Sequence, residues 1–453
     1  MWLEKLFKLK ENATDIRTEV LAGTTTFMTM AYIIFVQPAI LSQCGMDFNA
    51  VMVATCVSSA IGCFLMGLLA NYPIALAPAM GHNVYFAFVA CPMIAGILGP
   101  GSDIAPWRVA LGAVLLSGMV FIFFSFFGIR ERIIKALPVS IRNAIAVGIG
   151  LLITLIGFEW SGLTVPDKSI YLTLGKLNSA PVLLSLFGLV VISSLMARKV
   201  RGAILIGMVI TAAAGTTCGI IRYSGITSSI PSISPTFMRL SFSGALDMGF
   251  LELIFVFFFL DLFDTVGTLI GVSEKAGFMK DNELPRAKQA LFADATATVT
   301  GAVLGTSTVT SYVESASGVS QGGRTGLANV VTGLLMLLAL FFRPLIAMIG
   351  TSHMTADGLL LYPVISPVLI IVGCMMMSCV KKIDWDDLTE AIPAFLTIAV
   401  MPFCGFSITE GISFGFISYV ILKTVSGKMR EIPAFLSLFA GLFILRYIFM
   451  FAR

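Results

Sequence analysis

The sequence GTSTVTSYVES, residues 305–315, interrupts the apolar runs of this chain. Its first part is rich in Thr and Ser, which are common at helix N-caps. A second stretch of the same kind, NYPIALAPAMGHN, covers residues 71–83. In it, Pro78 suits the first position of a helix. Both stretches therefore predict an extended strand that leads into a short half-helix.

The composition places these stretches in a membrane. Of 453 residues, 57% are hydrophobic and 12% are charged, whereas a soluble domain has about 25% charged residues. Apolar runs of about 20 residues, long enough to cross a bilayer, recur along the chain. Residues 1–17 are charged and lack the apolar core of a signal peptide, so we expect this segment to stay in the cytoplasm. The eight cysteines have no metal-ligand spacing and predict packing residues.

Basic residues occur in short clusters that alternate with loops rich in Ser, Thr, Pro and Gly. Such clusters indicate cytoplasmic loops, and they explain the net charge of +4 without a nucleic-acid partner. The clusters are Lys5 to Arg17, Arg130 to Lys135, Arg198 to Arg201, Lys275 to Lys288, Lys381 with Lys382, and Lys423 to Arg430.

The apolar segments form two sets, separated by a break near residues 222–248. Seven segments precede the break and seven or eight follow it, which favours a duplicated unit covering residues 18–235 and 236–453. Segments 389–402 and 409–424 are short, so they are either one crossing or two. The predicted segments are 20–41, 49–70, 78–98, 109–128, 140–159, 181–197 and 202–221, then 249–272, 287–304, 310–322, 327–349, 361–380, 389–402, 409–424 and 434–451.

The two half-helices occupy corresponding positions in the two sets. Unwound backbone at membrane depth is tolerated only where it is buried in protein or lines a cavity. Broken helices at matching places in two repeats are typical of a transporter's binding site near the middle of the membrane. We therefore predict a site where these half-helices begin.

The run FVFFFLDLFDTVGT, residues 255–268, places Asp261 and Asp264 in an apolar span. A charge inside a membrane costs at least a few kcal/mol and indicates function. At this spacing both carboxylates lie on one helical face. Two carboxylates without a basic partner do not both ionise easily, so one can hold a proton. We predict that this pair is one titrating unit of a proton-coupled carrier.

Glu314 is predicted one turn into the second half-helix, beside unpaired backbone donors. Asn83 offers an amide that both donates and accepts at the corresponding place in the first half. This combination fits a planar, polar, neutral heterocycle better than an inorganic ion. The role of Asp294 is left open: it belongs either to the site or to the cytoplasmic end of its helix. His82 is interpreted as a packing histidine.

Four motifs also resemble a known family. In this order and over nearly the whole chain, they resemble the purine-specific, AzgA-like branch of the nucleobase:cation symporters, within the nucleobase-ascorbate transporter superfamily. Three positions depart from the family pattern: Ala79 replaces the usual Gly, His82 an apolar residue, and Gln37 the usual Asn. The motifs are TTTFMTMAYII at 24–34, APAMGHNVYFA at 77–87, DLFDTVGT at 261–268 and GTSTVTSYVES at 305–315.

The resemblance implies about fourteen segments in two inverted repeats of seven, divided into a core and a gate. The core covers about residues 18–128 and 249–349, and the gate about 138–222 and 359–453. It implies proton-driven uptake of hypoxanthine, guanine or adenine without a cofactor or metal. Its implied substrate contacts are Asp261, Glu314, Asn83, Gly81, Thr310 and Ser311, and its implied proton-coupling residues are Asp264 and Asp261.

The sequence thus predicts an all-α, multi-pass symporter of the cytoplasmic membrane. Its predicted partners are a purine base, a proton and membrane lipid, and a homodimer is left open. Oxopurines are favoured, because a carboxylate readily accepts from a ring N–H. An anion carrier of the same architecture is the alternative, disfavoured by the carboxylates. An enzyme is disfavoured because no metalloprotease motif, catalytic Ser-Lys spacing or CxxC is present.

Overall fold

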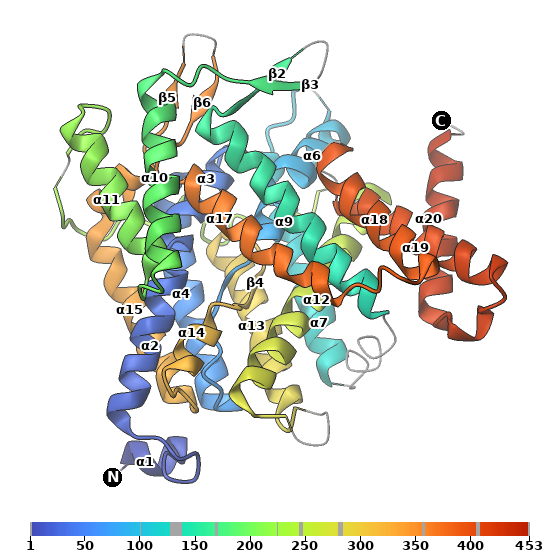
Figure 1. The fold of residues 1–453 in the computed structure, drawn as a ribbon, viewed down its shortest axis with the longest axis horizontal. Helices are drawn as coiled ribbons and strands as arrows, with labels where there is room; N and C mark the ends of the chain where they lie inside the picture. The colour runs from blue at the N-terminus through green and yellow to red at the C-terminus, as the bar shows by residue number, and fades with distance from the viewer. Residues whose placement is uncertain are drawn as a thin grey trace. The chain divides into compact units, whose positions relative to one another are not determined.

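The computed structural model describes residues 2–99, 101–126, 138–167, 171–223, 225–243, 248–279, 284–355, 358–404 and 408–451. Helices make up most of this structure (Figure 1). Nine of the helical stretches in these ranges are long and apolar enough to cross a membrane, and three further apolar helices are shorter. The predicted all-α polytopic fold is confirmed. The number of fourteen segments stays a prediction, and the predicted junction near residues 401–405 runs into residues 405–407, outside the described ranges.

The first half of the chain contains helices with two short strand pairings. Its elements are α1 (Trp2–Phe7), α2 (Ile16–Met30), α3 (Ile33–Ser42), α4 (Phe48–Leu65), the π-helical turn η1 (Met66–Ala70), β1 (Leu76–Pro78), α5 (Met80–Tyr85), the π-helical turn η2 (Phe86–Ala90), α6 (Cys91–Leu98), α7 (Pro106–Phe126), α9 (Val139–Ser161), β2 (Thr164–Asp167), β3 (Tyr171–Leu174), α10 (Ala180–Ala197) and α11 (Ala203–Thr217).

The second half begins with the longest helix, α12. Its elements are α12 (Met248–Ala276), α13 (Ala287–Leu304), β4 (Val309–Ser311), α14 (Ser315–Ser320), α15 (Gly326–Ala339), η3 (Leu340–Phe342), α16 (Arg343–Ile349), β5 (His353–Met354), β6 (Leu360–Leu361), α17 (Ser366–Met376), η4 (Met377–Lys382), α18 (Leu388–Phe403), α19 (Ile408–Val425), η5 (Met429–Glu431) and α20 (Ala434–Phe451).

The chain divides into two compact units. Unit 1 consists of Met1–Phe127 and Gly157–Val368, and unit 2 of Gly128–Ile156 and Leu369–Arg453. Each unit therefore contains residues from both halves of the sequence. The predicted bounds of the repeats, the core and the gate stay predictions.

In the interior of unit 1, β1 pairs antiparallel with β4, and both strands are fully buried. The two predicted half-helices preceded by extended strands are thus α5 and α14. The expectation that Pro78 opens the first half-helix was wrong, since α5 begins at Met80. The reason is that the strand pairing continues past Pro78: the Ala79 amide donates to the Thr308 carbonyl oxygen at 3.0 Å.

The predicted first segment is broken in the middle, between α2 and α3. Around the break the backbone tightens, because the Ile34 and Phe35 amides donate to carbonyls three residues earlier, at 3.1 Å each. This break directs Tyr32, which is 2% exposed, into the interior of unit 1.

A buried carboxylate joins α2 to the start of α15. Glu19 accepts from the backbone amides of Arg324 at 2.8 Å, Ala328 at 3.2 Å and Thr325 at 3.3 Å. Of these, the amides of Thr325, the N-cap, and Ala328 are among those that a helix start leaves without a helical partner. The helices pack closely here, since a Cβ on Gly23 would lie 2.3 Å from the Ala328 oxygen. Glu19 therefore acts as a cap supplied by a distant part of the chain.

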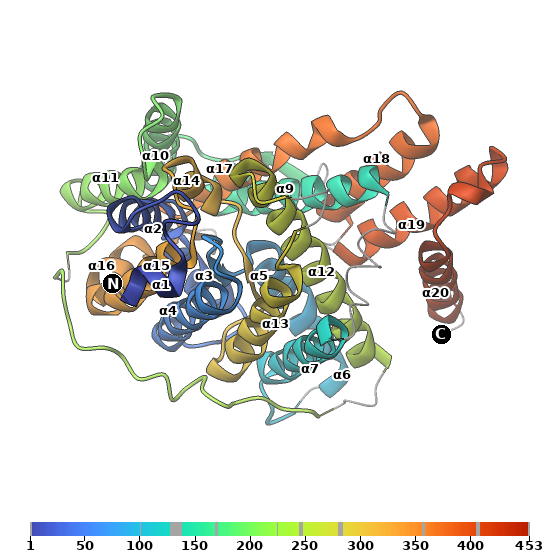
Figure 2. The same cartoon turned by 90° about the horizontal axis from the view of Figure 1, so that it is seen from below.

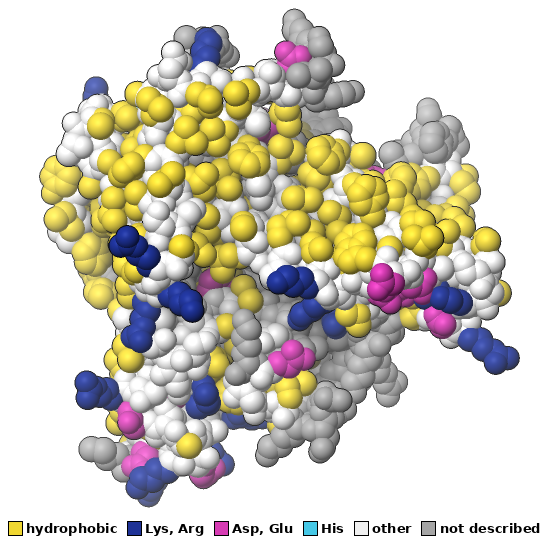
Figure 3. All heavy atoms as spheres, in the orientation of Figure 1, with side chains coloured by type: hydrophobic (Ala, Val, Ile, Leu, Met, Phe, Trp, Pro, Cys, Tyr) yellow, Lys and Arg dark blue, Asp and Glu magenta, His cyan; other side chains and the backbone are white. Residues whose placement is uncertain are grey.

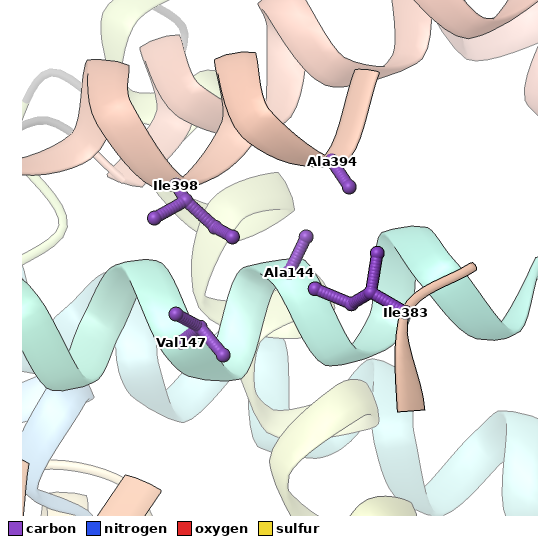
Figure 4. Packing of buried hydrophobic residues seen from close by; sticks show 5 residues of the cluster. All are labelled: Ala144, Val147, Ile383, Ala394 and Ile398. Atoms are coloured by element: carbon purple, nitrogen blue, oxygen red, sulfur yellow. The ribbon is translucent and has the colours of Figure 1, made fainter. Parts of the chain in front are cut away.

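Unit 2 has an apolar core of its own. Ala144 and Val147 on α9 pack with Ala394 and Ile398 on α18, and with Ile383 (Figure 4).

The surface of unit 1 is apolar where helices face outward. Over α10, for example, the exposed side chains include Leu183, Phe187 and Val190, and hydrophobic atoms cover much of this face (Figure 3). Such an exterior suits a lipid environment.

Candidate functional site

Polar side chains gather around the β1–β4 pair of unit 1. The pairing joins distant parts of the chain, with Leu76 opposite Ser311, Ala77 opposite Thr310 and Pro78 opposite Val309. Helices α12 and α13 contact β4. Helix α5 contacts both α3 and α12 (Figure 2). The predicted site residues on α5, α12, β4 and α14 therefore share one interior.

Glu314 lies where β4 leads into the second half-helix. It is the residue before α14 and is 7% exposed. It was expected one turn inside the helix, but the Tyr312 amide still donates to the Ala75 carbonyl at 2.9 Å, which extends the strand and delays the helix. The Tyr32 hydroxyl donates to Glu314 Oε1 at 2.6 Å. This bond holds one carboxylate oxygen and leaves the other as an acceptor.

Asn83 belongs to a second buried polar chain, which includes the residues just before β4. The Ser307 hydroxyl donates to Asn83 Oδ1. Gln37 Nε2 in turn donates to the hydroxyls of Thr306 at 2.8 Å and Ser307 at 3.3 Å. Within the described residues, Asn83 Nδ2 has no hydrogen-bond partner, so it is a buried donor available to a ligand. Gly81 is buried on the same half-helix.

Asp261 faces α13 and β4. It is fully buried, and it accepts from the hydroxyls of Thr265 at 3.1 Å and Thr298 at 3.3 Å. Thr265 also contacts Asp294 Oδ2 at 2.8 Å and Thr310 Oγ1 at 2.5 Å. Asp261 is thus linked to Asp294 through a shared hydroxyl.

Asp264 has different surroundings, although it lies only three residues further along α12. Its side chain is 38% exposed, and Oδ2 lies 3.9 Å from His82 Nδ1. It is also within electrostatic range of Asp294 and Glu314. The single titrating unit predicted for Asp261 and Asp264 stays a prediction, but the structure gives the two carboxylates different partners.

His82 is 1% exposed, and neither ring nitrogen has a hydrogen-bond partner among the described residues. In those same residues no group of His, Cys, Asp and Glu could hold a metal ion. The arrangement offers carboxylate acceptors, one amide donor and hydroxyls of both senses. These groups can bind a small polar molecule by hydrogen bonds.

The structure brings all the predicted site residues to the β1–β4 region. Ser311 donates to the Thr265 carbonyl at 3.2 Å, and Thr310 Oγ1 lies 3.2 Å from Asp294 Oδ1. The sequence left Asp294 open and missed Tyr32 and Thr265. The four-residue spacing from Asp261 to Thr265 was a usable signal, because it is the helical distance at which side chains meet.

Similarity to known proteins assigns the family. The profile of the permease family matches residues 17–414. A putative permease of Methanocaldococcus jannaschii, MJ0326, is 48% identical over 451 residues, which are 99% of each chain. The chain belongs to the permease family. This permease is therefore a multi-pass membrane transporter and not an enzyme.

Two further relatives have more specific names. The adenine permease AdeP of Escherichia coli is 43% identical, over 99% of this chain and 96% of the relative. The guanine/hypoxanthine permease PbuG of Bacillus subtilis is 43% identical, over 99% of this chain and 100% of the relative. The family resemblance seen in the motifs is confirmed.

Solved structures share the fold of this permease. The transmembrane domain of the cyanobacterium bicarbonate transporter BicA has a TM-score of 0.61 at 15% identity, covering 88% of this chain and 96% of that chain. SLC26A9 has a TM-score of 0.64 at 13% identity, covering 94% of this chain and 68% of that chain. At these identities the likeness shows the inverted-repeat fold and carries no argument about the substrate.

Proposed function

We propose that this permease imports purine nucleobases together with protons across the cytoplasmic membrane. The observation that carries the proposal is the buried carboxylate of Glu314, which Tyr32 orients and which lies in electrostatic range of the half-exposed Asp264. The names of the relatives, an adenine permease and a guanine/hypoxanthine permease, support the substrate class.

The groups of the site match a purine ring in hydrogen-bonding sense. A purine presents ring N–H donors and ring nitrogen acceptors on one rigid plane. The carboxylate of Glu314 accepts an N–H, and the Nδ2 donor of Asn83 serves a ring nitrogen or a carbonyl. The bond to the Glu314 carboxylate is charge-assisted and therefore roughly twice as strong as a neutral one, whereas the bond from Asn83 is neutral. Hypoxanthine and guanine carry a ring N–H beside a carbonyl, so we propose that they bind more tightly than adenine.

Proton coupling follows from the cost of buried charge. Asp261 and Asp294 are fully buried and Glu314 nearly so. Several carboxylates buried close together without a cation do not all ionise easily, because desolvation and mutual repulsion oppose it. A proton taken up with the base on the outside lowers this cost, and its release on the inside completes the cycle. Movement between outward-open and inward-open states then carries both.

Uptake into proteoliposomes tests this function. Labelled hypoxanthine, guanine and adenine are offered with an inward proton gradient, and uracil and bicarbonate serve as controls. We expect purines to accumulate above equilibrium and an uncoupler to abolish the accumulation. Purine accumulation that is unchanged by the uncoupler would contradict the proposed proton coupling. Bicarbonate uptake without purine uptake would instead favour an anion carrier.

A further inference from the structure

We propose that Asp261 and Asp294 share one proton through the hydroxyl of Thr265, and that this pair is the site that carries the transported proton. The inference rests on the proposed function and places its proton on a carboxylate from α13. It differs from the pairing of Asp261 with Asp264 that the sequence predicts. Both members of the proposed pair are fully buried.

Four short contacts link two carboxylates and two hydroxyls. Thr265 Oγ1 lies 3.1 Å from Asp261 Oδ1, 2.8 Å from Asp294 Oδ2 and 2.5 Å from Thr310 Oγ1. Thr310 Oγ1 lies 3.2 Å from Asp294 Oδ1. In this cluster the single hydroxyl of Thr265 contacts both carboxylates.

The number of protons decides how such a cluster is held together. A threonine hydroxyl has one proton to donate, and an ionised carboxylate has none. The two hydroxyls thus supply two protons for four contacts. The Thr298 hydroxyl does not relieve this shortage, because its shorter contact, 2.8 Å, is to the Val309 carbonyl rather than to Asp261 at 3.3 Å. A further proton on a carboxyl group makes a third contact a hydrogen bond and removes one of two adjacent charges.

The pair is connected to the substrate side through β4. Thr310 and Ser311 of β4 bond to the cluster or to the Thr265 carbonyl, and Thr298 bonds to Val309. Glu314 follows this strand by three residues. Loss of the shared proton changes the bonds that hold β4 and with them the position of Glu314. Proton occupancy and base binding are thereby linked through one short strand.

Other titratable groups surround the pair, and the test has to separate them. Asp264 lies on α12 itself, His82 on the neighbouring α5, and Glu314 before α14. Helix α4, which packs on α13, contributes the buried thiols of Cys56 and Cys63, and the start of α13 carries Lys288. Of these, Asp264 is the rival for the proton.

The main experiment compares accumulation with exchange. For each variant, gradient-driven purine accumulation is divided by purine counterflow exchange, and both are measured at several pH values on either side of neutral. In Asp294→Asn we expect purine accumulation to stop at equal concentrations inside and outside while exchange continues. The ratio should therefore fall and lose its pH dependence. The amide keeps the shape of the carboxyl group but cannot exchange the proton.

Thr265 supplies a matched pair of variants. Thr265→Val has nearly the same shape without the hydroxyl, and we expect about a tenfold loss in the ratio, the effect of about one buried hydrogen bond. Thr265→Ser restores the hydroxyl and should restore the ratio to within about twofold of wild type. Thr296→Val is the control on α13, because among the described residues the Thr296 hydroxyl bonds within its own helix, at 2.8 Å to the Phe292 carbonyl.

A second readout does not depend on transport. The infrared carbonyl band of a protonated carboxyl group should be present in wild type and in Thr296→Val at neutral pH, and absent in Asp294→Asn. A normal, pH-dependent ratio with a retained band in Asp294→Asn would overturn the proposal, as would an unchanged ratio in Thr265→Val. Loss of coupling only in Asp264→Asn would move the proton to Asp264. Failure of wild type to accumulate any purine would reject the proposed function, and the infrared band would still decide the shared proton.

Discussion

Carboxylates have different partners in the two units. In unit 1, Asp261 and Asp294 meet threonine hydroxyls, and Glu314 meets the hydroxyl of Tyr32. Asp264 faces the imidazole of His82 at 3.9 Å. A hydroxyl orients a carboxylate without neutralising it, so such a group can still bind a proton or a ligand's N–H.

In unit 2, carboxylates meet cations. The Lys423 ammonium, whose side chain is 3% exposed, lies 2.8 Å from Glu431, 3.0 Å from Glu390 and 3.6 Å from Asp387. Similarly, Arg446 Nη1 lies 2.8 Å from Glu410. Because the Lys423 side chain is itself buried, removal of all its carboxylate partners would leave a buried charge uncompensated. The carboxylates of unit 2 thus have cationic partners that compensate their charge, whereas the hydroxyl partners in unit 1 do not compensate the charge of Asp261, Asp294 and Glu314.

The largest expected effect is at Glu314. Glu314→Gln and Glu314→Ala should each lower purine affinity by about 30- to 100-fold, because a charge-assisted bond of about 2–3 kcal/mol is lost. In Gln, moreover, a donor can face the ligand's own donor. Equilibrium binding of labelled hypoxanthine to the purified protein measures this.

Glu390→Gln is the matched change in unit 2. We expect it to lower the free energy of unfolding by about 1–3 kcal/mol and to leave affinity for hypoxanthine within about twofold, since Lys423 keeps Glu431 as a partner. Unchanged affinity in Glu314→Gln, or a loss of affinity without destabilisation in Glu390→Gln, would break the distinction between the two units.

A smaller effect is expected at Tyr32, which acts through Glu314. Tyr32→Phe removes only the hydroxyl that bonds Glu314 Oε1 at 2.6 Å. Affinity should fall about 5- to 10-fold, the effect of about one oriented hydrogen bond. In the double variant with Glu314→Gln, Tyr32→Phe should have almost no further effect. Additive losses would show that Tyr32 acts independently of Glu314.

Asp387 tests the ionic group of unit 2 by pH. The hydrogen bond from Lys428, followed by those from Thr389, holds the pKa of Asp387 well below its usual 3.8. A depressed pKa means that the ionised form favours folding above the unfolded-state pKa, and that this contribution disappears as pH falls through the folded-state pKa. The Tm difference between wild type and Asp387→Asn should therefore be constant near neutral pH and shrink below about pH 4. A difference that grows on acidification would contradict this.

The smallest effect is expected at His82. Because its ring nitrogens have no hydrogen-bond partner among the described residues, His82→Leu removes no bond and should alter uptake and its pH dependence by less than about twofold. Uptake between about pH 5.5 and 7.5 measures this, the range in which histidine ordinarily titrates. Loss of the acid stimulation in this variant would give His82 a proton role and would place the Asp264–His82 pair among the coupling groups.

Local chemistry in the sequence determined the elements of the site. Apolar runs predicted the membrane helices, and the Thr- and Ser-rich stretch before Glu314 predicted a strand and a half-helix because such residues do not sustain a helical apolar pattern. Asp261, Asp264 and Glu314 stood out because charge is costly among apolar neighbours. Each of these predictions depends only on residues that are close together in the sequence.

The partner of each carboxylate depends on contacts between distant parts of the chain, which the tertiary structure shows. Glu314 meets a tyrosine 282 positions away, Thr265 meets Thr310 across 45 positions, and Glu19 caps α15 from 305 positions away. A hydroxyl or an amide partner has no distinctive local pattern, since it becomes significant only when the fold places it within about 3 Å of an acceptor. For the same reason the sequence placed Asp261 and Asp264 in one pair, whereas their side chains, three residues apart on one helix, face different neighbours.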